Sequence, residues 1–74
     1  MSFRGYLETI ETKTGKSPGD LRRYAAEKGW TEAGALRPEV KAGTIVADCK
    51  ESLGLGHGHA MAVVALLKGK AEDS

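Results

Sequence analysis

The apolar run at residues 60–67 is the feature that most constrains what this chain can fold into. It begins directly after segment 54–59, in which every second residue is a glycine. Apolar residues surround most of the girth of a helix built over about residues 58–68, with Met61 on its inward side, so this helix is expected at the centre of a hydrophobic core. The glycines permit a sharp reversal of the chain before it. The sequence therefore predicts a helical hairpin whose second helix is central to the fold.

Two amphipathic helices with clear end signals are predicted in the first half of the chain. In the first, the apolar residues recur with helical spacing, Ser2 is the predicted N-cap and Gly15 is the predicted stop. In the second, Ser17 is followed three residues later by Asp20, which is the spacing of a capping box. Gly29 is the predicted stop of this helix.

A third helix is predicted from about residue 39 or 41 to residue 52. Gly43 within it marks either a close contact between helices or the true start of the helix. Residues 30–38 are interpreted as a loop with at most one helical turn, and no strand is expected there. Trp30 and Leu36 are expected to fold back from this loop over the core.

These elements predict an all-α fold, a small compact bundle of about four short helices in which a Gly-rich hairpin joins the last two. A single helical domain is expected over residues 1–69, followed by a polar C-terminal tail at 70–74. A chain of 74 residues leaves a narrow margin of stability. Its one cysteine, Cys49, can neither form an internal disulfide nor provide a zinc framework.

Composition and charge limit the classes of function. Apolar residues make up 41% of the chain and charged residues 28%, which is typical of folded proteins. The formal net charge of +1 opposes strong non-specific binding to nucleic acid. No secretory signal is recognisable and the longest apolar run is too short to span a bilayer, so we expect a cytoplasmic protein without a membrane partner. No catalytic grouping is legible, so the sequence predicts neither an enzyme nor a metal or cofactor site.

The glycine-rich segment before the last helix is the candidate binding site. Gly54, Gly56 and Ala60 fit the pattern G-h-G-x-x-x-A, which resembles the hairpin of helix-hairpin-helix modules. In such a hairpin the glycines let the turn approach a DNA phosphate, and the amides at the helix start bind it. The sequence thus favours a phosphate- or nucleic-acid-binding module, whose candidate residues are Gly54, Gly56, His57, Gly58, His59, Lys68 and Lys70.

Other interpretations of this region stay open. Gly54 can simply end the third helix, and the glycines after it can simply permit the reversal. Alternatively, the apolar face of the last helix can bind a protein partner or a second copy of the chain. A metal site is disfavoured because His57 and His59, two residues apart, point in different directions on a helix.

Four segments, taken in order, resemble one bacterial family. They are residues 1–8, 13–18, 41–46 and 54–62. Together they are similar to the family of domain of unknown function 4287 over nearly the whole chain. The resemblance implies a short helical cytoplasmic domain, found alone or fused to other small domains, and it brings no established activity. The chain departs from the family at Asp48 and Cys49, where a bulky apolar pair such as Trp-Leu is expected.

Overall fold

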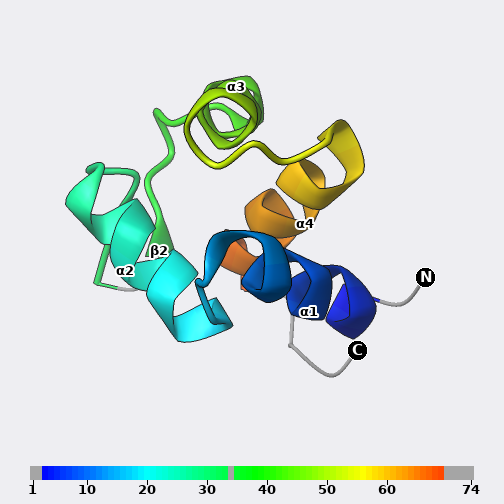
Figure 1. Ribbon diagram of the computed structural model, residues 1–74. Helices are drawn as coiled ribbons and strands as arrows, with labels where there is room; N and C mark the ends of the chain where they lie inside the picture. Colours follow the sequence, from blue (N-terminus) through cyan, green and yellow to red (C-terminus); the bar gives the residue numbers. More distant parts are fainter. Residues whose placement is uncertain (1–2, 34, 70–74) are drawn as a thin grey trace.

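The chain folds into four helices, with a short two-stranded hairpin between the second and the third (Figure 1). The computed structural model describes residues 3–33 and 35–69, so the predicted cap Ser2 and the predicted tail at 70–74 lie outside the described residues. The four predicted helices are confirmed. The elements are α1 (Phe3–Thr14), α2 (Pro18–Glu27), β1 (Thr31–Glu32), β2 (Ala35–Leu36), α3 (Ala42–Ser52) and α4 (His57–Leu67).

The predicted stop of α1 and both predicted end signals of α2 are confirmed. The capping box forms at α2, because the Asp20 N–H donates to the Ser17 hydroxyl at 3.2 Å and the Ser17 N–H donates to the Asp20 carboxylate at 3.1 Å. Gly15 and Gly29 follow the two helices with φ of +74° and +81°, a conformation that only glycine adopts without strain. Gly43 lies in the first turn of α3 with open space around it, so it marks the helix start rather than a close contact.

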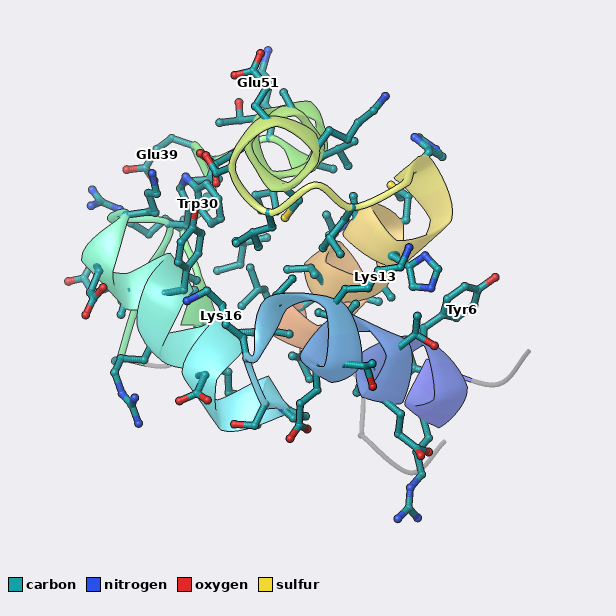
Figure 2. The ribbon with its side chains drawn as sticks, in the orientation of Figure 1. Tyr6, Lys13, Lys16, Trp30, Glu39 and Glu51 are labelled. Carbon is teal, nitrogen blue, oxygen red and sulfur yellow. The ribbon has the colours of Figure 1, made fainter. Side chains whose placement is uncertain are left out.

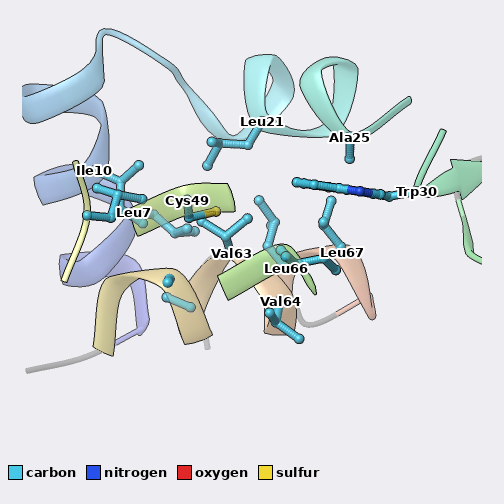
Figure 3. Packing of buried hydrophobic residues seen from close by; sticks show 14 residues of the cluster. Leu7, Ile10, Leu21, Ala25, Trp30, Cys49, Val63, Val64, Leu66 and Leu67 are labelled. Carbon is cyan, nitrogen blue, oxygen red and sulfur yellow. The ribbon is translucent and has the colours of Figure 1, made fainter. Parts of the chain in front are cut away.

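Helix α4 lies at the centre of the fold, as its apolar run predicts. It contacts each of the other three helices, and Figure 3 shows their side chains converging around it. Its buried residues are Ala60, Ala62, Val63, Val64, Leu66 and Leu67. Met61 is instead 41% exposed, so its predicted inward position is wrong. Met61 lies four residues after the exposed His57, on the one strip of α4 that the other helices leave open.

The segment between α2 and α3 contains a small antiparallel hairpin, which corrects the prediction of a loop without strands. Thr31 pairs with Leu36 and Glu32 with Ala35. Strands this short carry no alternating pattern in the sequence, which is why they were not predicted. Trp30 is only 7% exposed and, with the half-buried Leu36, covers the core as predicted. Within residues 3–33 and 35–69 no helix has the length and apolar character needed to cross a membrane.

Candidate functional site

The connection between α3 and α4 is a tight turn built around Gly54. Gly54 follows Leu53, the C-cap residue of α3, with a φ of +67°, which agrees with a helix-ending role. The next residue, Leu55, turns inward and is 3% exposed, and its N–H donates to the carbonyl of Cys49 at 3.2 Å. The buried Leu55 fixes the turn to the core and leaves Gly56 on the surface.

The start of α4 presents backbone N–H groups to solvent. Gly56 is the N-cap residue, with φ −74° and ψ 170°, and no side chain caps this end. The first helical hydrogen bond runs from the Ala60 N–H to the Gly56 carbonyl at 2.9 Å. The amides of residues 57–59 therefore precede the helical ladder, and Gly56, His57 and Gly58 are all exposed. Unpaired amides and the positive end of the helix dipole together suit an anion.

The two histidines point in different directions, as their spacing predicts. His57 is exposed, whereas the ring of His59 packs edge-on against Tyr6, with ring centroids 5.0 Å apart and planes at 81°. The Nε2 atom of His59 is buried and has no hydrogen-bond partner within the described part of the chain. The imidazole of His57 is thus exposed in the first turn of α4, whereas the imidazole of His59 is packed against α1.

Helix α1 supplies a residue that sequence reasoning did not assign to the site. A Cβ atom added to Gly58 would lie 3.8 Å from Cε1 of Tyr6, so the tyrosine ring packs directly against the first turn of α4. Figure 2 shows Tyr6 and Lys13 on α1, with the Lys13 side chain extending toward the start of α4. The two are seven residues apart and share a face of α1, but only the fold reveals that this face meets the glycine turn.

The predicted lysines do not join this site in the described structure. Lys68 follows α4 at its opposite end, about 16 Å from the first turn at 1.5 Å per residue. Lys70 lies outside the described residues. The structure therefore brings together Gly54, Gly56, His57, Gly58 and His59, but it separates Lys68 from them.

A second polar cluster joins α2 to α3 and accounts for the unusual Asp48. The Tyr24 hydroxyl donates to Asp48 at 2.6 Å, and the Lys28 ammonium lies 3.4 Å from the same carboxylate. These two partners hold the pKa of Asp48 below its ordinary value, while burial and the carboxylate raise the pKa of Tyr24. The ammonium groups of Lys16 and Lys28 lie 5.2 and 5.4 Å from the centroid of the Tyr24 ring. The cluster serves as a link between helices.

Cys49, beside Asp48, is a core residue. It is 0% exposed, and burial raises the pKa of its thiol to about 11, so it is a poor nucleophile in the folded chain. Across residues 3–33 and 35–69, no group of three or more His, Cys, Asp or Glu side chains could hold a metal ion.

The comparisons with known proteins bear on the family alone. The model of the family "Domain of unknown function (DUF4287)" matches residues 2–69, which is nearly the whole chain. No curated protein and no solved structure matches the chain. This match agrees with the four sequence segments that resemble the family. The chain therefore belongs to the DUF4287 family of domains of unknown function.

Proposed function

We propose that this domain is a binding module that holds a phosphate group of a nucleic acid at the start of α4. The observation that carries the proposal is the exposed, uncapped first turn of α4, which directly follows the glycine turn. Three successive amides and the helix dipole favour a bound anion there. Gly56 and Gly58 have no side chains that would obstruct a phosphate from reaching these amides.

Two side chains next to the turn support an anionic ligand. His57 is exposed within the first turn, and Lys13 extends toward it from α1 in Figure 2. The sequence pattern that resembles a helix-hairpin-helix turn includes Ala60, and Ala60 is 0% exposed, which agrees with a small residue packed in the core. Because the net charge of the chain is only +1, we expect the contact to involve few phosphates. Binding should then weaken as salt is added, and the logarithm of the binding constant should fall against the logarithm of the salt concentration with a slope of about −1 to −2.

The alternative, a protein-binding or homodimer surface on the apolar face of α4, has less support. Six apolar residues of α4 are buried by the chain itself, at 0 to 6% exposure. Met61, at 41%, is the one large apolar side chain exposed among the described residues. A single methionine offers far less area than a stable protein interface needs. We therefore favour the phosphate module.

The variant Gly56→Asp separates ligand binding from stability. A Cβ at Gly56 meets nothing within 4 Å, and the φ of −74° suits any residue. An aspartate at this N-cap position accepts hydrogen bonds from the first-turn amides and adds a negative charge. We expect it to raise the free energy of unfolding by about 1 kcal/mol. It should also weaken binding of an oligonucleotide at least about fivefold, because the carboxylate occupies the anion position.

Gly43→Asp is the matched control, because Gly43 lies in the first turn of α3 and its surroundings are also open. It changes the charge equally and should leave oligonucleotide binding unchanged. The full chain, labelled with ¹⁵N, is titrated at low salt with single-stranded DNA, with duplex DNA and with inorganic phosphate. We expect the amide signals of residues 57–59 to shift with DNA. If these signals stay fixed, or if both variants bind DNA equally, the proposal is wrong; shifts with inorganic phosphate alone would identify a phosphate site without a role in nucleic-acid binding.

A further inference from the structure

An open groove lies at the other end of α4, between the end of that helix and the connection from β2 to α3. It has a volume of about 550 Å³. The half-buried side chains of Leu36 and Val40 and the buried Leu67 give it apolar walls, with Pro38 beside them. This groove is separate from the candidate phosphate site, because α4 spans the distance between the two.

β2 contributes Ala35 and Leu36 to the lining of the groove, and its edge away from β1 has no partner strand among the described residues. The Arg37 N–H donates to the carbonyl of Trp30 at 2.9 Å, and Glu32 pairs with Ala35. In an antiparallel ladder, pairs that exchange hydrogen bonds alternate with pairs that do not. Leu36, between these two positions, therefore directs its N–H and C=O away from β1. An unpaired strand edge can accept an added strand, and here that edge belongs to a strand that lines the groove.

The charge around the groove indicates what kind of strand fits. Two basic residues, Arg37 and Lys68, line it, and no acidic residue does. The Arg37 guanidinium pairs with Glu39 at 2.7 Å, outside the lining. Lys68 is exposed and has no ion-pair partner in the described part of the chain. Because no described acidic residue pairs with Lys68, this cation at the end of α4 favours a carboxylate on the occupant.

We propose that this groove binds an extended peptide segment of another protein. The peptide pairs with the backbone of Leu36 as a third strand, and its apolar side chain rests against Val40 and Leu67. A carboxylate on the same peptide lies beside Lys68. Because β2 is only two residues long, backbone pairing alone gives little selectivity. An apolar and an acidic side chain two positions apart point to the same face of an extended peptide, and this pair is then what the groove recognises.

A displayed library of random heptapeptides tests this proposal. The library is selected on the immobilised full chain, and enriched peptides are synthesised and titrated into ¹⁵N-labelled full chain. We expect enriched sequences to carry an apolar and an acidic residue two positions apart and to shift the amide signals of Leu36 and Arg37. The variant Lys68→Glu should weaken their binding at least about threefold. Lys50→Glu makes the same charge change in the last turn of α3, outside the groove, and should not affect binding.

Several outcomes would overturn the proposal. Selection without acidic–apolar enrichment, shifts confined to other amides, or equal binding by the Lys68→Glu and Lys50→Glu variants each contradict it. Self-association of the chain that Lys68→Glu abolishes would identify a second copy as the occupant. If peptides bind only a chain that ends at Gly69, residues 70–74 are the occupant. Circular dichroism of each variant confirms that a loss of binding reflects the groove and not unfolding.

Discussion

At the scale of single residues, the backbone conformation of this chain is controlled at a few left-handed positions. Among the described residues, glycine occupies four of these, at Gly15, Gly29, Gly54 and Gly69. Gly15 and Gly29 were predicted from the sequence as helix stops, and for Gly54 this role was one of the open interpretations. The fifth position is Ala33, between β1 and β2, with a φ of +53°. A side chain with a Cβ atom is strained there, by roughly 1 kcal/mol.

The strain at Ala33 predicts that Ala33→Gly stabilises the domain. Glycine adopts a positive φ freely, although it also loses more freedom on folding, so the expected net gain is about 0.5 kcal/mol in the free energy of unfolding. Ala26→Gly is the control, because Ala26 is exposed within α2 and glycine costs about 1 kcal/mol inside a helix. Urea unfolding measures both. A loss of stability in Ala33→Gly would contradict the strain argument.

At the scale of elements, the helices could be predicted because their caps, stops and apolar spacing are local signals. The hairpin could not be, because two-residue strands depend on pairing across a turn rather than on a pattern. The glycine turn of the candidate site could be predicted from the sequence, because its residues form one continuous segment. The place of Tyr6 in this site could not be predicted, because only the packing of α1 on α4 brings its ring to Gly58. In the sequence, Asp48 replaces a bulky apolar residue expected in α3. The structure explains this residue, because Asp48 accepts a hydrogen bond from the Tyr24 hydroxyl on α2.

The link between α2 and α3 predicts the effect of Asp48→Asn. The substitution weakens the bond from the Tyr24 hydroxyl and removes the ion pair with Lys28, so we expect a loss of about 1 kcal/mol at pH 7. The pKa of Asp48 is lowered in the folded chain. Its stabilising contribution is therefore complete above the unfolded pKa of about 4 and is lost as the pH falls through the folded pKa.

The difference in stability between the native chain and Asp48→Asn should thus shrink below about pH 4. Urea unfolding followed by tryptophan fluorescence at a series of pH values measures it, because Trp30 lies against Tyr24, with centroids 5.9 Å apart. Glu51→Gln, at an exposed position of α3, controls for the general change of charge. A difference that persists unchanged at pH 3 would show that the carboxylate itself is not the source of the stabilisation.

At the scale of the whole molecule, stability depends on one small core around α4. That helix also connects the two proposed binding surfaces, because its first turn faces the phosphate site and its last residues border the groove. A chain of 74 residues without an internal disulfide is expected to be stable by only about 3 to 5 kcal/mol. The reactivity of Cys49 reports on this free energy of unfolding, because its side chain is 0% exposed in the core (Figure 3) and becomes accessible only when the core opens.

The thiol of Cys49 should react with a disulfide reagent only when the core opens. Burial and the raised pKa, about 11, suppress the reaction in the folded chain, so labelling at pH 8 should be at least about a hundredfold slower than in denaturant. If opening is global, Asp48→Asn should accelerate labelling about fivefold, which corresponds to its loss of about 1 kcal/mol. Cys49→Ser gives the unlabelled baseline. Labelling that is slow but insensitive to Asp48→Asn would instead reveal a local opening that exposes Cys49 while the link between α2 and α3 stays intact.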